Sequence, residues 1–520
     1  MRVVRLVFVI LSFCTLASPD VFAQVHRILP VGDRSYEYIQ RLQRRGILLD
    51  LNPTALPYRE GEIVEALDNV KEDGLSSIEQ RWVRQLRSRF HVTPVGKAEI
   101  AAGLELEMGG SAVNSERRDV LRPLRNHVRG FEHLAVRAFL EHGSFIAQFG
   151  GRHDLYYDRD PDGISPVNRL KSRPEDDYIG YDGSFASVFL GRFANHWAAV
   201  DAPASVISAN PRPYDQINLR FGGKRFSLRS LLGELDSITA DGRFTGIAGD
   251  DSVRAGSERR YIAAHRFDWR PSPTVVVTFI ESALYSGANS GLSLKYLNPF
   301  SMAILTVDNR PKNDENNGLV GGSIWVQAHR TTFFGQLMFD DFDILNRQEP
   351  ASFTLIGRIT RPTSPFADLG IELEIVSART YNTAQPEGKY LFLLRGLATQ
   401  FSDYLHANAF SDLYLDQVLP GLTISPRFDY LAQGESDIRQ PFPPKGSPIP
   451  TLLNGIVERT YRGALRLDFQ PDDWWWIGAD VGVNHVTNEH AVMGRHSTHF
   501  VGQVEFGLRL SLDRAVHLDF

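Results

Sequence analysis

Hydrophobic and polar positions alternate with a period of two at the C-terminal end of the chain. In residues 505–520 the even positions hold phenylalanine, leucine or valine, apart from Arg514, and the odd positions hold polar or small residues. This pattern predicts a β-strand with one apolar face. A hairpin turning at Asp513-Arg514 is the alternative. It would move His517 and Asp519 onto the apolar face, so we favour a single long strand.

The predicted terminal strand is long enough to cross a bilayer, since about 9–11 tilted residues suffice. It ends on Phe520, and outer-membrane barrels typically close with a strand that ends in an aromatic residue. We therefore expect an all-β transmembrane fold, a large antiparallel outer-membrane β-barrel. We also expect the barrel-assembly machinery to recognise the strand that ends at Phe520.

Further strand-like segments, separated by turn-rich breaks, follow from about residue 97 onward. With a few weaker segments added, they predict between about 14 and 20 strands. The segments are Ala101–Met108, Phe131–Leu140, Ser144–Phe149, Ser184–Phe193, Arg259–Arg270, Thr274–Leu284, Ser323–His329, Thr332–Phe339, Ser352–Ile359, Leu369–Ala378, Leu422–Leu431, Tyr461–Phe469 and Trp475–Asn484.

The longer polar breaks are candidate extracellular loops, because outer-membrane barrels have long loops outside and short turns in the periplasm. The short Pro271-Ser272-Pro273 break predicts a periplasmic turn. The candidate loops are Tyr156–Asp182, Asp241–Ser257, Asp308–Gly318 and Gln433–Leu452.

Aromatic residues gather near predicted strand ends. Such residues are typical of the interfacial girdle, where an apolar ring with a polar edge prefers the head-group layer. A platform for stacking sugars is the alternative interpretation of the tryptophans. The residues are Tyr156, Tyr157, Tyr285, Tyr296, Trp474, Trp475 and Trp476.

The composition agrees with a barrel. The 520 residues are 42% hydrophobic and 11% aromatic, with a mean hydropathy of -0.22. A helical membrane protein is far more apolar, whereas a barrel combines lipid-facing residues with an equal number that face the lumen. The formal net charge of -6 argues against a nucleic-acid partner.

The N-terminus predicts a signal peptide. A basic start, Met1 to Arg5, precedes the apolar run Leu6–Ala17, and Val21-Phe22-Ala23 offers a cleavage site after Ala23. The single cysteine, Cys14, would leave with the signal. We therefore expect no disulfide, thiolate metal site or cysteine catalysis in the mature chain.

Residues 24–96 predict a small periplasmic module of three helices. The first carries Tyr36, Ile39 and Leu42 at helical spacing, and the second starts near Pro57. The third starts at Ser76, with Glu79 completing a capping box. One face of this third helix is basic. We interpret that face as solvated, with contact to an acidic polysaccharide or lipid head group as the alternative; it consists of Arg81, Arg84, Arg87 and Arg89.

Several stretches resemble the Wzi capsule-assembly family. In the helical module these are Leu29–Leu42, Arg45-Gly46-Ile47 and Leu56–Ile63, which are also similar to S-layer homology repeats. The corresponding stretches of the predicted barrel are Leu190–Trp197, Glu281–Tyr285 and Tyr296–Phe300. The S-layer-like helices depart from the helical bundle of enterobacterial members, which puts the periplasmic partner in doubt.

The resemblance implies a barrel of about eighteen strands that binds capsular polysaccharide or exopolysaccharide at the surface of a Gram-negative cell. Family members retain or help assemble the polymer without acting as enzymes. A general or sugar-selective diffusion porin is the alternative function. We further expect contact with outer-membrane lipid and lipopolysaccharide, a monomeric state and no cofactor.

Two local motifs could suggest other chemistry. His142-Gly143-Ser144 joins a histidine to a serine, but nothing indicates an activated nucleophile, so we expect a turn. Asp158–Gly163 resembles the start of a calcium loop, yet Arg169 stands where such a loop needs a bidentate glutamate. We therefore exclude an EF-hand and expect no metal site, while a looser Ca²⁺ site between loop and sugar stays open.

Polysaccharide binding requires planar hydrogen-bond donors, amides and aromatic faces. Two groups of residues near predicted strand ends supply them. The alternative is that Arg192 and Glu281 belong to a ladder of charges inside the lumen. The candidate binding residues are Arg192, Asn195, His196, Trp197, Tyr296 and Asn298.

Overall fold

The computed structural model describes most of the chain. The predicted signal peptide, Arg169 and the terminal Phe520 lie outside the described residues, as do parts of the loops predicted at Asp241–Ser257 and Asp308–Gly318. The described residues are 26–90, 99–124, 127–163, 171–237, 245–247, 250–254, 259–287, 290–302, 316–340, 352–444, 447 and 449–517.

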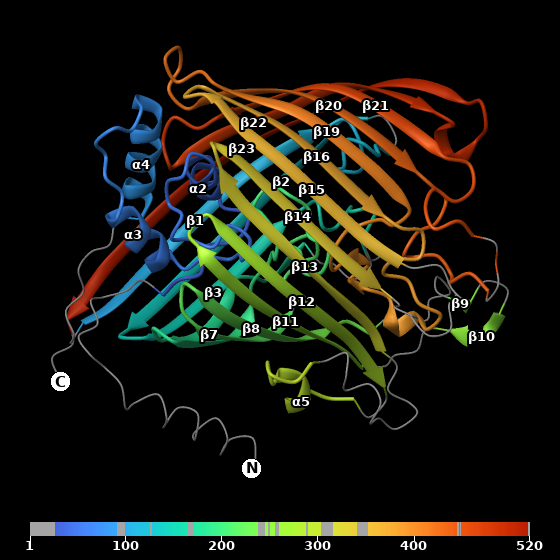
Figure 1. Ribbon diagram of the computed structural model, residues 1–520, viewed down its shortest axis with the longest axis horizontal. Helices are drawn as coiled ribbons and strands as arrows, with labels where there is room; N and C mark the ends of the chain where they lie inside the picture. Colours follow the sequence, from blue (N-terminus) through green and yellow to red (C-terminus); the bar gives the residue numbers. More distant parts are fainter. Residues whose placement is uncertain are drawn as a thin grey trace.

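Eighteen antiparallel strands of the described chain close into one barrel (Figure 1). They follow one another around the ring in chain order, and the last strand pairs with the first. They are β1 Glu99–Val113, β2 Arg129–His142, β3 Phe145–Asp154, β5 Asp177–Asp182, β6 Ala186–Arg192, β7 Asp215–Gly222, β8 Phe226–Leu235, β11 Arg259–Ser272, β12 Val275–Gly287, β13 Asn316–Ala328, β14 Thr331–Asp340, β15 Ser352–Ser364, β16 Ala367–Val376, β19 Tyr404–Tyr414, β20 Leu422–Gln433, β21 Glu458–Phe469, β22 Trp475–Thr487 and β23 His496–His517.

The terminal strand closes the ring as one continuous element. β23 pairs with β1 from Val113 opposite Gln503 to Glu99 opposite His517, with Asp513 and Arg514 inside the ladder. The hairpin alternative is therefore wrong, and the single long strand is confirmed over the described residues.

The strands show the predicted alternation, with apolar side chains on the outer, lipid-facing wall and charged side chains toward the lumen. Leu104 of β1 and Phe506 and Leu510 of β23 are exposed on the outer wall. Glu105 of β1 points inward, where its carboxylate accepts a hydrogen bond from Arg89 of the N-terminal segment (2.7 Å). A closed barrel with an apolar outer band is the architecture of proteins that span the Gram-negative outer membrane. The predicted fold class and location are therefore confirmed.

In the described part of the chain, no helix is long and apolar enough to span a membrane.

Four of the eighteen barrel strands were not predicted from the sequence patterns. They are β5, β7, β8 and β19, and β5 lies inside the stretch predicted as the loop Tyr156–Asp182. For β8 the physical reason is visible. Leu231 packs into a core inside the barrel, while the next residue, Leu232, packs beneath a segment on the outside. Both faces of the strand are apolar there, and the period-two signal is lost.

Three helices precede the barrel. The capping box of Ser76 and Glu79 is confirmed at the start of the third helix. The helices pack around a core that includes Tyr36, Ile39 and Trp82. Their bounds are α2 Ser35–Arg44, α3 Glu60–Asp68 and α4 Ser77–Arg89. Residues 91–98 are not described, so the boundary predicted at residue 96 stays a prediction.

The N-terminal segment, residues 26–90, occupies the short-turn end of the lumen, and we call it the plug. Figure 1 shows α2 within the ring and α3 and α4 at its left end, opposite the end that carries β9 (Thr245–Ile247) and β10 (Asp250–Arg254). Arg34 pairs with Asp468 of β21 at 3.2 Å, and Arg44 pairs with Asp368 of β16 at 3.1 Å. Short turns face the periplasm in outer-membrane barrels. The plug therefore closes the periplasmic end.

The basic face of α4 does not act as one solvated surface. Arg81 pairs with Asp416 beyond β19, and Arg89 pairs with Glu105 of β1 at 2.7 Å. Arg87 pairs with Glu72 inside the plug, whereas Arg84 is exposed. Both sequence interpretations are therefore corrected for Arg81 and Arg89, because the barrel wall supplies their acidic partners.

Two long extracellular connections fold into the lumen and meet the plug. Residues 193–214 and 377–403 build a buried core against the inner wall, with Trp197, Tyr381 and Tyr390 among its largest side chains. The second connection includes the short elements η4 (Pro386–Gly388), β17 (Leu391–Phe392) and β18 (Arg395–Gly396). The backbone of His196 bonds to that of Leu56 in the plug, with N–O distances of 3.0 and 3.1 Å. The plug and the two inward connections therefore fill the lumen from its two ends.

Candidate functional site

A cleft opens at the extracellular end of the barrel. Residues from the connections β1–β2, β16–β19, β20–β21 and β22–β23 line it. Its outer part has a volume of about 860 Å³, and its inner part has about 490 Å³. Arg117, Arg122 and Phe401 line both parts. The two volumes therefore form one cleft that leads from the cell surface toward the plug.

Phe401 lies at the junction of the two parts, surrounded by guanidinium groups. The Cζ atoms of Arg122, Arg117 and Arg439 lie 4.5, 5.3 and 5.3 Å from the ring centroid. Arg122 also lies over the ring of Tyr404 at 4.9 Å. Cations over a ring face are attracted to its negative quadrupole. The aromatic rings thus hold three planar donors together.

Carboxylates and an amide fix the orientation of these arginines. Arg117 donates two hydrogen bonds to Asp162 (2.8 and 2.9 Å). Arg439 donates to Asp437 (2.9 and 2.8 Å) and to Asp162 (3.1 Å). Arg122 donates to the side-chain carbonyl of Gln433 (3.0 and 2.9 Å). The cleft therefore presents donors and acceptors side by side.

The charge state of these carboxylates follows from their partners. Burial alone would raise the pKa of Asp437, but hydrogen bonds and charge from Arg439 outweigh burial and lower that pKa. The pKa of Asp119 is lowered in the same way, because Arg122 and the backbone of Leu121 outweigh burial. Both carboxylates therefore stay ionised at neutral pH and keep the guanidinium groups of Arg439 and Arg122 aligned.

The rim of the cleft is more exposed than its centre. His490, Arg495 and His496 are exposed there, around the short helix η5 (Glu489–Ala491). Glu489 accepts hydrogen bonds from Ser497 (2.7 Å) and lies 2.7 Å from His499 Nε2. The rim can thus exchange hydrogen bonds with a ligand that arrives from solution.

The sequence-predicted residues of the first group lie beside this cleft, and most are buried. Arg192 is bidentate to Asp215 on the outer side of the rim (2.6 and 2.8 Å). Asn195 donates to Gln216 (2.8 Å). His196 is the member that lines the inner cleft. Trp197 is only 1% exposed within the lumen core. These four neighbours in the sequence therefore lie in different surroundings.

His196 holds the inward connection in place. Its Nε2 atom lies 3.2 and 3.0 Å from the carbonyl oxygens of Ala199 and Ala202. Since carbonyl oxygens only accept, Nε2 carries the proton. Burial lowers the pKa of the imidazole, so His196 is neutral at pH 7.

The second group lies on the outside of the barrel. Residues 290–302, which we call the strap, include α5 (Leu294–Leu297) and cover the outer wall at β8, β11 and β12. Tyr296 stacks on Tyr285 with a centroid distance of 4.3 Å, whereas Asn298 is exposed. Glu281 lies 2.9 Å from His265 beneath the strap. The predicted lumen ladder is therefore wrong, because Glu281 and Arg192 both point away from the lumen.

The remaining aromatic candidates divide between the two ends. Trp474 is exposed and follows the β21–β22 turn at the periplasmic end, while Trp476 is largely buried beneath Arg34. Tyr156 is buried near the extracellular end, with the Arg118 guanidinium 4.0 Å from its ring centroid. Both tryptophans thus lie far from the cleft; exposed Trp474 fits a girdle at the membrane interface, whereas Trp476 faces the plug inside the lumen.

The calcium-like stretch instead supplies partners for arginines. Asp160 accepts hydrogen bonds from Arg395, including one of 2.7 Å, and Asp162 accepts from Arg117 and Arg439. Within the described ranges no group of three or more His, Cys, Asp or Glu residues could hold a metal ion. His142-Gly143-Ser144 forms the β2–β3 turn, as predicted.

The sequence patterns missed the centre of the cleft. Arg117, Arg118 and Arg122 form a basic run in a turn-rich break, which is a signal that could have indicated them. Phe401 and Arg439 carry no comparable local signal. They reach the cleft only because two distant connections fold over the same end of the barrel.

No family model and no curated protein matches this sequence. Among solved structures, the fold is similar to Wzi, described as a carbohydrate-binding β-barrel of the outer membrane involved in group 1 capsule assembly in Escherichia coli. The TM-score is 0.63 at 11% identity, over 95% of this chain and 100% of that one. OccK10 of Pseudomonas aeruginosa has a TM-score of 0.44 at 9% identity, over 80% of this chain and 99% of that one. OccAB2 of Acinetobacter baumannii has a TM-score of 0.43 at 10% identity, over 80% and 98%. The likeness to Wzi confirms the predicted resemblance at the level of the fold.

Proposed function

We propose that this outer-membrane barrel binds capsular polysaccharide or exopolysaccharide at the cell surface, and retains or helps assemble the polymer without chemical turnover. The observation that carries the proposal is Phe401 with three guanidinium groups around it, in a cleft that opens at the extracellular end.

The lining chemistry suits sugars. A sugar hydroxyl both donates and accepts hydrogen bonds, and the paired arginines and carboxylates of the cleft offer both partners within one sugar unit. Planar guanidinium groups also suit the carboxylates of acidic polymers. Contacts repeated along a polymer add avidity even where each single contact is weak. The fold likeness to a barrel described as carbohydrate binding supports the same conclusion.

The filled lumen favours binding over general diffusion. The plug contacts the inner wall at β1, β16 and β21, among other strands, and reaches the inward connection at His196. A porin needs a continuous aqueous path. We therefore prefer the anchoring role to the porin alternative.

The sugar-contact role of the sequence-predicted residues stays a prediction. Arg192 and Asn298 keep accessible surface, whereas the burial of Asn195, His196, Trp197 and Tyr296 favours roles in holding the inward connection and the strap.

A deletion strain tests the proposal. It should still make the polysaccharide but release more of it into the medium, because the surface contact is lost. A strain carrying Arg122→Gln with Arg439→Gln should shed polymer like the deletion strain, while the matched variant Arg84→Gln, changed on the exposed face of α4, should retain it. Arg192→Gln then tests the outer rim separately.

Unchanged cell-associated polymer in the deletion strain would contradict the anchoring role. Loss of all polymer, inside and outside the cell, would point to synthesis or export instead. Equal amounts of folded barrel in each strain, seen as a heat-dependent shift on SDS gels, are the required control.

A further inference from the structure

A second cavity lies at the opposite end of the barrel. It has a volume of about 360 Å³, within the range of about 300–1,000 Å³ that is typical of ligand pockets. The plug supplies one wall, with Asp50, Tyr58 and Glu62, and the inner faces and periplasmic turns of β5 to β8, with β11, supply the other. The extracellular cleft is lined by a different set of residues.

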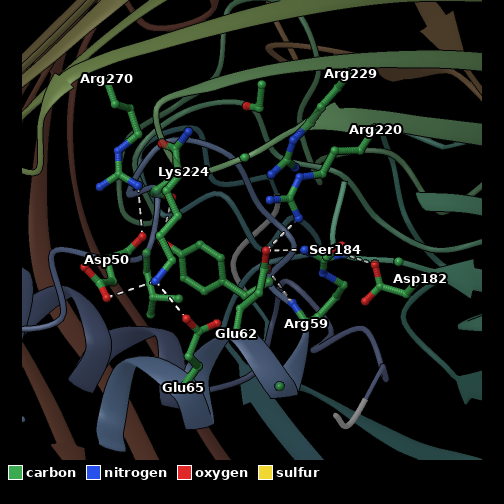
Figure 2. Close-up of a pocket in the computed structure, with 17 residues that line it drawn as sticks. Asp50, Arg59, Glu62, Glu65, Asp182, Ser184, Arg220, Lys224, Arg229 and Arg270 are labelled. Carbon is green, nitrogen blue, oxygen red and sulfur yellow. Dashed lines mark hydrogen bonds and ion pairs between the residues drawn. The ribbon is translucent and has the colours of Figure 1, made fainter. Parts of the chain in front are cut away.

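Basic side chains outnumber acidic ones in this cavity, five to four. Figure 2 shows them converging from the wall and from the plug. We call this site the periplasmic basic pocket, defined by Arg59, Arg220, Lys224, Arg229 and Arg270.

The carboxylates of the pocket are already engaged at its mouth. Glu62 accepts from Arg59 and from Arg220 (2.7 Å), and Asp182 accepts from Arg59. Lys224 bridges Asp50 (3.1 Å) and Glu65 (2.9 Å). These four acids therefore engage three of the five cations directly, and the pocket as a whole carries one excess positive charge.

The two remaining arginines lie deeper and contact only neutral acceptors. Arg229 donates to the carbonyl of Ala55 at 3.3 Å. Arg270 donates to the carbonyls of Asp50 (2.9 Å) and Leu49. Across the part of the chain that the structure describes, neither guanidinium forms an ion pair. Carboxylates lie near both arginines, those of Asp268 and Glu62 for Arg229 and those of Asp268 and Asp50 for Arg270. Two guanidinium groups whose direct contacts are neutral acceptors can nevertheless receive an anion in a confined polar cavity, because charge-assisted hydrogen bonds are the strong ones.

We propose that the periplasmic basic pocket binds the anionic group, a carboxylate or a phosphate, of a periplasmic ligand. Arg229 and Arg270 hold the charge, and Lys224 and Ser184 at the mouth meet the rest of the ligand. The pocket is reached from the periplasm because its mouth includes the β5–β6 and β7–β8 turns, where Ser184 and Lys224 are exposed. The site is separate from the proposed polysaccharide cleft and does not depend on it.

Titration calorimetry on the full-length protein in detergent tests the proposal, with inorganic phosphate and glucuronate as probes. Wild-type protein should bind at least one of them. Arg229→Gln with Arg270→Gln should weaken that binding by about tenfold or more, since charge-assisted contacts are lost. Arg225→Gln is the control: it removes one guanidinium from the neighbouring β7–β8 turn, outside the pocket lining, and should leave the affinity within about twofold.

Because Arg229 and Arg270 also hold the plug, a second variant keeps both. Ser184→Glu adds a negative charge at the exposed mouth and should weaken binding of either anion without loss of folded barrel. The titrations are repeated in an Arg122→Gln, Arg439→Gln background, where the extracellular cleft is disabled as a second site for glucuronate. Arg229→Gln with Arg270→Gln should weaken anion binding in that background as well, so failure of one site is distinguishable from failure of the other.

Binding of phosphate alone identifies a phosphorylated ligand, and binding of glucuronate alone identifies an acidic saccharide; both support the pocket. Three results would overturn it. They are no binding of either anion, equal weakening in Arg225→Gln, and affinity in Ser184→Glu equal to that of the wild type.

Discussion

Asp33 shows how a single side chain attaches the plug to the barrel. Its carboxylate lies 3.0 Å from Arg509 of β23 and 3.6 Å from Arg89 of α4, and it accepts a hydrogen bond from the backbone of Ser35 (2.8 Å). The side chain is only 2% exposed. Burial alone would raise the pKa of Asp33, but the two arginines outweigh burial and lower the pKa to about 2.

This pKa predicts a pH-dependent plug. Because the folded pKa lies below the unfolded value of about 3.9, the stabilisation is complete above pH 4 and is lost as the pH falls toward 2. Asp33→Asn should cost about 2 kcal/mol at neutral pH and reduce the change between pH 4 and 2, since Glu105 and Asp468 also pair with arginines of the plug. Protease access to the plug at each pH is the measurement, and Asp73→Asn, at an exposed position, is the control. A wild-type plug that is equally protected at pH 2 and pH 7 would contradict this role of Asp33.

The strap lies on the outer wall of the barrel, where the sequence patterns predicted no such segment. Arg266 of β11 points inward to Thr54 of the plug, so its neighbour His265 points outward. There His265 Nε2 lies 2.9 Å from the carbonyl of Tyr296, and Ser230 donates to the carbonyl of Leu297 (2.9 Å). These polar groups on a lipid-facing wall are covered, because an uncovered polar group there is costly.

The strap predicts a local effect of one substitution. His265→Ala should release residues 290–302 from the wall, since the contact to the Tyr296 carbonyl is removed while the strand ladder is kept. Chymotrypsin should then cut near Tyr296 or Phe300 faster than in the wild type. His485→Ala, at an exposed position of β22, is the matched control and should change nothing. Equal cleavage rates in His265→Ala and wild type would show that other contacts hold the strap.

The whole molecule is a barrel closed from both ends. The plug enters from the periplasmic side, two connections enter from the extracellular side, and they meet where Leu56 bonds to His196. The plug, the wall and the inward connections pair their charges inside the lumen. Arg44 of the plug, for example, pairs with Asp368 of β16 and with Asp201 of the inward connection.

This arrangement predicts electrical silence. In planar bilayers the purified protein should show no large steady conductance, because the lumen is filled. A variant lacking residues 26–90 should conduct more than the wild type, because only the two inward connections then remain in the lumen; a heat-dependent gel shift shows that the variant is folded. Large and weakly selective channels in the wild type would contradict the filled lumen and favour the porin alternative.

The sequence by itself determined the barrel. Lipid outside and charge inside impose a period of two on each crossing strand, and that pattern is local, so Leu104 next to Glu105 and the long terminal strand could be recognised without neighbours. The capping box at Ser76 and the short turns are local in the same sense. The pattern failed at β8 because both of its faces are apolar there.

The tertiary structure alone decided what fills the lumen and where the cleft lies. The partners of Arg81 and Arg89 are 335 and 16 residues away along the chain. A helix face that the local sequence predicts to be solvated therefore packs on the barrel wall. Phe401 meets Arg117 and Arg439 only after separate connections fold over one end of the barrel. Such contacts form only when segments far apart in the sequence come together in the fold. The spacing of residues within one segment therefore cannot predict them.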